Sequence, residues 1–386
     1  MNNSEAQGKI AVFFVLFLMS LSLHVQFPIF TPFAVALGAT SVFISIMMST
    51  SSMTNLIGHV ISGPFIDKIG KKPFIVIPLF ISSILMTSHG LAARPEQLLI
   101  LRIFNGFVLA FMSPACFSLL SAYAKNTRQQ GKNMAVNGMM VTLANIIAPF
   151  IGGYLVDIFD YKGTYFFIGS ALLFTAIFAL IFVKERDPIV VHKKDGHPLS
   201  KVLMSRDLLP IYFIGFSLMF SHGALIFELP FLTVEKGLKA SETGFLFSIM
   251  GLGSLLAYCS FWLNRISPLF RTIAGMVASG LLYYQLTTSI LPVSQSMILF
   301  FLGFAFGSIF PALMTLLTEK VGQSHYGSAF GVLSAIFSLA FILSSLTAGI
   351  VRAFVSPYYL AFLMTMLSVA YIVFDHFRVK KVADVS

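Results

Sequence analysis

The sequence has few charged residues, two cysteines and a single tryptophan. Only 10% of its 386 residues are Asp, Glu, Lys or Arg, and 57% are hydrophobic. Typical soluble domains have about 25% charged residues. A soluble protein of this length could not form its water-exposed surface with so few charged side chains. Cys116 and Cys259 both lie inside long apolar segments, which excludes a disulfide framework and a cysteine metal site. The composition therefore predicts an integral membrane protein.

The sequence also lacks the motifs of energy-driven and catalytic membrane proteins. It contains no G-x-x-x-x-G-K-[ST] phosphate loop, so we expect no nucleotide to drive it. It contains neither H-E-x-x-H nor paired acids inside an apolar segment, which disfavours a membrane-embedded enzyme. We therefore expect no enzymatic activity, no cofactor and no metal site.

Long apolar runs dominate the chain. A membrane-spanning helix needs about 20 mostly apolar residues. The first run continues past Pro28 without a small-residue cleavage site, so we interpret it as a span and not as a signal peptide. The sequence predicts twelve spans, at 10–37, 41–66, 73–93, 97–124, 133–158, 162–184, 208–234, 241–265, 270–291, 294–319, 327–352 and 355–377.

The only long polar segment separates the sixth span from the seventh. The predicted organisation is thus an N-terminal six-helix bundle (1–184), a linker (185–207) and a C-terminal six-helix bundle (208–386). With alternating spans, nineteen of the 25 Lys and Arg residues fall on the side of the termini and the linker. Cytoplasmic loops carry an excess of such residues. We therefore expect both termini in the cytoplasm, and the net charge of +10 does not indicate nucleic-acid binding.

The two halves resemble each other at a constant offset. Gly106 and Pro114 in the fourth span match Gly303 and Pro311 in the tenth, 197 residues later. The same offset relates the loop pairs Asp67-Lys68 and Asn264-Arg265. Parallel repeats of this kind are typical of transporters, with the substrate cavity between the halves near the bilayer midplane. A receptor has little reason to contain such a repeat.

The loop after the second span carries the most specific motif. Its sequence, Gly63-Pro-Phe-Ile-Asp67-Lys68-Ile-Gly70-Lys71-Lys72, resembles the G-x-x-x-D-[RK]-x-G-[RK]-[RK] signature of the major facilitator superfamily. The resemblance implies an all-α membrane protein with twelve transmembrane helices in two pseudo-symmetric bundles. It also implies that Asp67, with Lys71 and Lys72, latches the cytoplasmic face.

Two further motifs resemble those of drug:proton antiporters in this superfamily. Arg102 and Gly106 match the family's R-x-x-x-G motif, and an arginine in a span costs about 2.5–3.5 kcal/mol on insertion scales. In these relatives the arginine is implicated in proton coupling. The fifth span carries Ala148, Pro149, Gly152 and Gly153, similar to the exporters' G-x-x-x-G-P-x-x-G-G motif, with alanines at the first two glycine positions.

One acidic residue lies well inside an apolar segment. Glu228, in Phe227-Glu-Leu-Pro230, resembles the proton-coupling glutamate of several drug:proton antiporters. We expect it to carry the proton, with Arg102 as its electrostatic modulator. Glu228 lies 21 residues after Asp207, about 32 Å at ~1.5 Å per residue, which places it near the outer boundary unless the helix is long or broken.

Other polar residues in the spans are weaker candidates for the substrate cavity. Histidine carries protons near neutral pH, and amides bind polar groups of a substrate. Lone intramembrane polar residues more often bond neighbouring helices, as we expect for His59 and His89. The cavity candidates are His24, Gln26, Asn55, Asn145, His222 and Gln285.

These features together predict a secondary transporter. The resemblance favours a monomeric, proton-coupled exporter of small amphipathic or lipophilic compounds. Short loops between the spans favour a bacterial inner membrane. A proton symporter or facilitator that imports a sugar or organic anion, and an exporter of one dedicated metabolite, remain as alternatives.

Overall fold

The computed structural model describes residues 3–124, 127–185, 208–321 and 326–383. Side chains are not described at 3–6, 63, 64, 67, 127, 128, 264, 326–328 and 376–383. Within these ranges the regular elements are helices, without strands. This confirms the predicted all-α class.

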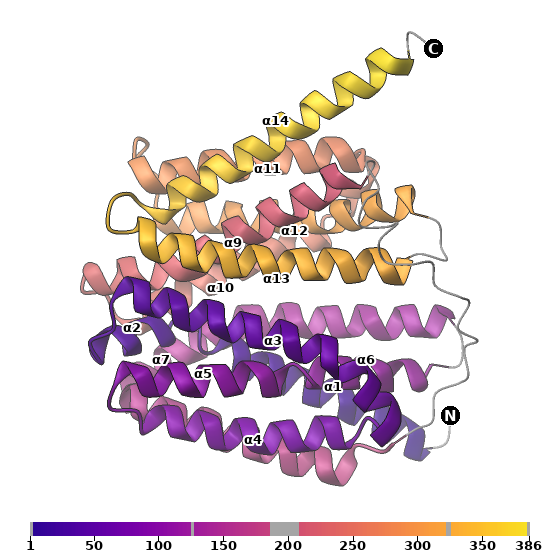
Figure 1. Cartoon of the computed structure of the whole chain (residues 1–386), viewed down its shortest axis with the longest axis vertical. Helices are drawn as coiled ribbons and strands as arrows, with labels where there is room; N and C mark the ends of the chain where they lie inside the picture. Colours follow the sequence, from indigo (N-terminus) through magenta and orange to yellow (C-terminus); the bar gives the residue numbers. More distant parts are fainter. Residues whose placement is uncertain (1–2, 125–126, 186–207, 322–325, 384–386) are drawn as a thin grey trace. The chain divides into compact units, whose positions relative to one another are not determined.

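Contacts divide the chain into two units. Unit 1 contains Met1–His192 with Pro230–Ser248, and unit 2 contains Lys193–Leu229 with Ile249–Ser386. Both units are built from long apolar helices (Figure 1).

The first seven helices belong to unit 1. Helix α7 packs along α1 and α4, and α3 packs along α5. Figure 1 shows α3, α5 and α4 as neighbouring, nearly parallel helices. Their bounds are α1 Asn3–His24, α2 Phe30–Ala36, α3 Ser41–Ile69, α4 Pro73–Gly90, α5 Pro95–Leu109, α6 Met112–Ala122 and α7 Thr127–Phe182.

The remaining helices belong mainly to unit 2. Helix α11 packs along α12 and α14, and buried apolar side chains of α9, α11, α12, α13 and α14 form the core. The bounds are α9 Leu209–Glu235, α10 Ala240–Cys259, the 3₁₀ helix η1 Phe261–Arg265, α11 Pro268–Thr288, α12 Gln295–Lys320, α13 Tyr326–Val351 and α14 Pro357–Ala383.

The helices account for the twelve predicted spans. Nine helical segments of the described chain are long and apolar enough to cross a membrane. One of them, within α7, has 54 residues, or about 81 Å, which is enough for two crossings of a ~30 Å core. Asp160, at φ 59°, interrupts α7 between the predicted fifth and sixth spans. Helices α3 and α11 coincide with the other two predicted spans, although neither is among these nine segments.

Two predicted spans are broken, which the sequence analysis did not foresee. Span 10–37 is divided between α1 and α2, and span 97–124 between α5 and α6. A proline clashes with the carbonyl four residues earlier and cannot donate a hydrogen bond to it. Pro28 lies four residues after the end of α1 at His24, and Pro114 lies four after the break at Ala110. Span 241–265 is also shorter than predicted, because α10 ends at Cys259.

The repeat predicted from the 197-residue offset is visible in helix packing. A Cβ atom at Gly106 would collide with the carbonyl of Ser51 on α3, and one at Gly303 with the carbonyl of Met250 on α10. The carbonyl oxygen of Gly106 accepts a hydrogen bond from Asn55 Nδ2 (3.1 Å). That of Gly303 accepts one from Ser254 Oγ (2.9 Å). The equivalent helix pairs therefore approach through equivalent glycines.

Candidate transport site

The loop motif forms a binding site for a carboxylate. Helix α3 ends at Ile69, Gly70 turns the chain at φ 109° and ψ 166°, and α4 begins at Pro73. This backbone region is essentially restricted to glycine. Glu185, beyond the end of α7, accepts hydrogen bonds from the backbone N–H groups of Lys71 (3.0 Å) and Lys72 (2.6 Å).

A side-chain ion pair reinforces this contact. Lys71 is buried, and its Nζ lies 3.4 Å from Glu185 Oε1. Successive backbone N–H groups in a tight turn make an anion-binding concavity, which this carboxylate occupies. Lys68 is exposed, whereas the burial of Gly63 and the side chain of Asp67 are not described. The latch role of Asp67 therefore stays a prediction.

Arg102 packs against an aromatic ring of unit 1. Its guanidinium carbon lies 3.6 Å from the centre of the Phe30 ring, in the geometry of a cation–π contact. Such contacts contribute about 2 kcal/mol or more when desolvated. Phe30 is the first residue of α2, so the break at Pro28 determines where this ring lies. Arg102 thus bonds to protein and does not depend on lipid headgroups alone.

Further aromatic side chains surround this contact. Tyr165 interacts electrostatically with Arg102 and stacks on His89, with ring centres 5.3 Å apart. Phe33 of α2 packs on Tyr165 at 5.4 Å. We name these residues the Arg102 cluster: Phe30, Phe33, His89, Arg102 and Tyr165. The cluster joins α2, α4, α5 and α7 within unit 1.

Glu228 forms a buried ion pair in unit 2. Its Oε2 lies 2.9 Å from Nε of Arg352, which follows the end of α13. The side chains of Glu228 and Arg352 are 3% and 15% exposed. Although residue counting places Glu228 near the outer boundary, its carboxylate is enclosed by protein. Removing one member of such a pair leaves an uncompensated buried charge.

Two tyrosines complete the surroundings of this pair. Tyr358, at the start of α14, is buried and interacts electrostatically with both Glu228 and Arg352. Its ring centre lies 6.3 Å from that of Tyr283 on α11, whose hydroxyl donates a hydrogen bond to the Ser221 carbonyl (3.0 Å). The Glu228 pair therefore connects α9 to the turn between α13 and α14.

The span-five motif lies in the first half of α7. Ala148, Pro149, Gly152 and Gly153 are all buried. A Cβ atom at Gly152 would collide with the carbonyl of Val25, in the break after α1. The motif thus allows α7 to approach the broken first span closely.

The weaker cavity candidates differ in their surroundings. Asn55 bonds the Gly106 carbonyl, and Gln285 bonds both backbone groups of Leu291, so both side chains hold structure together. His24 Nδ1 lies 2.6 Å from the carbonyl of Ser20. The remaining candidates are Gln26, which is buried and bonds the Ser22 carbonyl, Asn145, which is half-buried, and His222, which packs on Phe306.

The partners of the candidate residues could not be predicted from the sequence. Arg352 is the last residue of the predicted span 327–352 and lies 124 residues from Glu228, so the sequence does not pair them. Glu185 was counted only as part of the linker. The structure pairs Glu228 with Arg352 in unit 2 and Arg102 with Phe30 in unit 1. A second basic residue at the same predicted depth as Glu228 is the one signal that could have suggested Arg352.

The sequence of the chain matches the family model of the Major Facilitator Superfamily over residues 12–345. The chain therefore belongs to this superfamily of integral membrane transporters.

Curated relatives share about a quarter of its residues. An uncharacterized MFS-type transporter of Methanocaldococcus jannaschii is 24% identical over 83% of this chain and 85% of its own. The multi-drug resistance efflux pump PmrA of Streptococcus pneumoniae is 24% identical over 91% and 90%. The quinolone resistance protein NorA of Staphylococcus aureus is 21% identical over 88% of each chain.

Solved structures confirm the fold. A bacterial homologue of the human lysosomal transporter Spinster, in an inward-facing and occupied conformation, superposes with a TM-score of 0.78 and 15% identity, over 97% of this chain and 96% of its own. A POT family transporter in complex with a thioalcohol-conjugated peptide gives 0.77 and 14%, over 97% and 96%. Both predicted features, the superfamily resemblance and its helical fold, are thus confirmed.

The Glu185 contact generates a first prediction. Glu185→Ala removes the acceptor of the Lys71 and Lys72 backbone N–H groups, so these amides should exchange hydrogen faster. Hydrogen exchange measured by mass spectrometry on peptides covering 70–74 checks this. Glu96→Ala, at an acidic residue in the first turn of α5, is the matched control and should leave that exchange unchanged. Unaltered exchange in Glu185→Ala would contradict the role assigned to this carboxylate.

The buried pair generates a second prediction. Glu228→Gln and Arg352→Gln should each lower the free energy of unfolding by about 3–5 kcal/mol, because each leaves a buried charge without its partner. The double variant should cost clearly less than the sum, with a coupling of roughly 0.5–3 kcal/mol. Unfolding in detergent measures all three variants.

Arg94, an exposed residue before α5, provides the control for this cycle. Arg94→Gln combined with Glu228→Gln should give additive changes in the free energy of unfolding. Additivity for Glu228 and Arg352 themselves would show that the pair contributes no coupling.

Proposed function

We propose that this transporter exports small amphipathic or lipophilic compounds in exchange for protons, by alternating access. The observation that carries the proposal is the enclosed carboxylate of Glu228, ion-paired to Arg352. Intramembrane acids of this kind mark proton pathways. The resemblance to the efflux proteins PmrA and NorA supports the substrate class.

Proton binding at Glu228 acts through its partner. A proton on Glu228 neutralises the carboxylate and removes its attraction for the Arg352 guanidinium. Arg352 retains its charge and then favours water over the protein interior. Because Arg352 follows α13 and Tyr358 lies in the first turn of α14, this change is transmitted to both helices. Protonation thereby biases the C-terminal bundle toward a different arrangement.

Arg102 has a supporting role in the proposed mechanism. Its charge is held over Phe30 and beside Tyr165, so it contributes a fixed positive potential to the N-terminal bundle. This potential modulates proton binding and favours anionic over cationic groups nearby.

The loop motif is the proposed cytoplasmic gate. Gly63, Asp67, Lys68, Gly70, Lys71 and Lys72 form it, and Glu185 fixes its second half. The proposed bundles are 1–184 and 208–386, joined by the 185–207 linker. The excess of Lys and Arg on one side supports cytoplasmic termini, and we propose a monomer in a bacterial plasma membrane.

Proton flux in proteoliposomes tests the proposed function. Adding lipophilic cations and neutral amphiphiles to the wild type should produce proton movement with particular compounds only. Glu228→Gln should abolish this movement and retain compound binding, because the amide preserves shape but carries no proton. Compound-dependent flux that persists in Glu228→Gln would remove Glu228 from the mechanism.

An importer or a carrier of one metabolite would give a different result. The alanines at 144 and 148, in place of the exporters' glycines, are the observation that favours this alternative. No compound of the panel would then move protons in the wild type, and counterflow under an imposed pH gradient would distinguish import from export.

The gate has its own test. Asp67→Asn should slow transport several-fold with little change in substrate affinity, because a latch affects the rate of rearrangement and not the binding pocket. Transport rates and binding affinities, measured on the same preparation, check this. Normal turnover with a large loss of affinity would contradict the latch role.

A further inference from the structure

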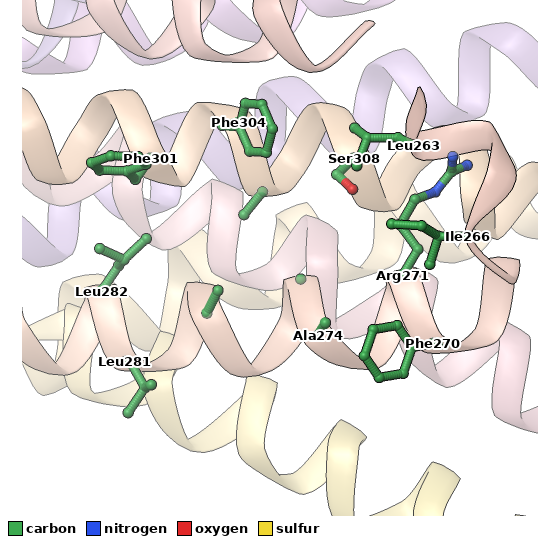
Figure 2. Close-up of a pocket in the computed structure, with 13 residues that line it drawn as sticks. Leu263, Ile266, Phe270, Arg271, Ala274, Leu281, Leu282, Phe301, Phe304 and Ser308 are labelled. Atoms are coloured by element: carbon green, nitrogen blue, oxygen red, sulfur yellow. The ribbon is translucent and has the colours of Figure 1, made fainter. Parts of the chain in front are cut away.

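An apolar groove lies between α11 and α12 in unit 2, and its lining includes neither Glu228 nor Arg352. Its volume is about 470 Å³, within the ~300–1,000 Å³ of small-molecule pockets. Small residues of α11, Ala274, Gly275 and Ala278, make the floor, and Phe301 and Phe304 of α12 make one wall. Figure 2 shows these aromatic rings along α12, next to α11.

One end of the groove carries a positive charge. Arg271, the single ionisable side chain among the lining residues, extends from α11 toward Leu263 and Ser308 (Figure 2). Its side chain is largely enclosed, since the residue is 7% exposed. The opposite end, around Leu281 and Leu282, is apolar. A ligand that fits both ends therefore has an anionic group and a long apolar part.

The length of the groove matches one leaflet of a bilayer. Arg271 and Leu282 are eleven residues apart on one helix, or about 16 Å at ~1.5 Å per residue. The hydrocarbon core of a bilayer is about 30 Å thick, so the groove extends over about half of it. Phe270 and Leu281 at its two ends are exposed.

The element beside the charged end has the composition of a membrane interface. Phe261 and Trp262 of η1 are 78% and 58% exposed, and Arg265 follows them. Tryptophan is enriched at the level of lipid headgroups. The Arg271 end of the groove is thus the end expected beside the headgroups, on the cytoplasmic side in the orientation proposed above.

We propose that this groove binds one acyl chain of an anionic phospholipid, with the phosphate held at the Arg271 end. The guanidinium group suits phosphate oxygens, and the apolar lining suits the acyl chain. The lone cationic lining residue disfavours lipophilic cations, which separates this site from the proposed transport substrates. The chain thereby has a lipid site that is independent of transport.

The single tryptophan of the chain provides a direct measurement. Trp262 precedes Leu263, a lining residue of the groove, so bromine atoms on a bound acyl chain should quench its fluorescence. The protein is placed in nanodiscs of phosphatidylcholine that contain a small fraction of brominated phosphatidylglycerol or brominated phosphatidylcholine. The brominated anionic lipid should quench more strongly than the zwitterionic one. Equal quenching in the wild type would overturn the proposal.

Two arginines give a matched pair of variants. Arg271→Gln should remove the difference between the two brominated lipids, because the headgroup preference depends on this charge. Arg265→Gln removes an exposed cation of η1 that does not line the groove, and it should keep the difference. Loss in both variants, or in Arg265→Gln alone, would indicate general surface electrostatics and overturn the proposal.

A third variant tests the groove itself and does not depend on the folding of Arg271→Gln. Ala278→Phe fills the middle of the groove from an exposed position on α11 and should reduce quenching by the anionic lipid to the zwitterionic level. Inorganic phosphate should not restore fluorescence in the wild type, since it lacks the acyl chain. Unchanged quenching in Ala278→Phe, or displacement of the lipid by phosphate or by the lipophilic cation tetraphenylphosphonium, would overturn the assignment.

Discussion

Charged side chains inside apolar helices need partners from the protein, and this constraint governs both candidate sites. A buried charge without a partner costs several kcal/mol, which is a large fraction of the total stability of a typical fold. Arg102 meets the constraint with the face of Phe30, and Glu228 meets it with the guanidinium of Arg352. Each contact joins elements of one unit, α5 to α2 in the first and α9 to the α13–α14 turn in the second. Each charge is therefore stabilised only when its two elements are packed together, and its contact in turn holds those elements in place.

Close backbone approach supplies the rest of the packing. Apolar helices in lipid associate through van der Waals contact and hydrogen bonds, because lipid is as apolar as they are. At Gly106 and at Gly303 the backbone of a neighbouring helix packs directly against the glycine. A polar side chain of that helix donates a hydrogen bond to each glycine carbonyl. Such interfaces resist sliding. The proposed alternating access would then move whole bundles and leave these helix pairs intact.

Much of the fold was predictable from the sequence, because apolar run length and charge asymmetry follow directly from the bilayer. The helix breaks were less predictable, because Pro28 and Pro114 follow the two breaks by four residues whereas Pro149, Pro230 and Pro311 lie inside helices that continue past them. The candidate residues Arg102 and Glu228 were predictable as costly charges in apolar surroundings. Their partners were not, since Arg352 is 124 residues from Glu228 and only tertiary packing joins them.

The repeat of the two halves does not extend to their charge contacts. The 197-residue offset aligns Phe227 and Glu228 with Phe30 and Thr31. The two contacts use neighbouring and not equivalent positions, because Arg102 contacts Phe30 whereas Arg352 pairs with Glu228, the residue aligned with Thr31.

The two contacts respond differently to protons. A cation–π contact involves no group that titrates near neutral pH, whereas a carboxylate pair is weakened when its acid is protonated. The N-terminal half thus holds a proton-insensitive contact, and the C-terminal half holds a proton-sensitive one. Under the proposed mechanism, the charge that changes with protonation is that of Glu228, in the C-terminal bundle. The charge of Arg102, in the N-terminal bundle, stays constant.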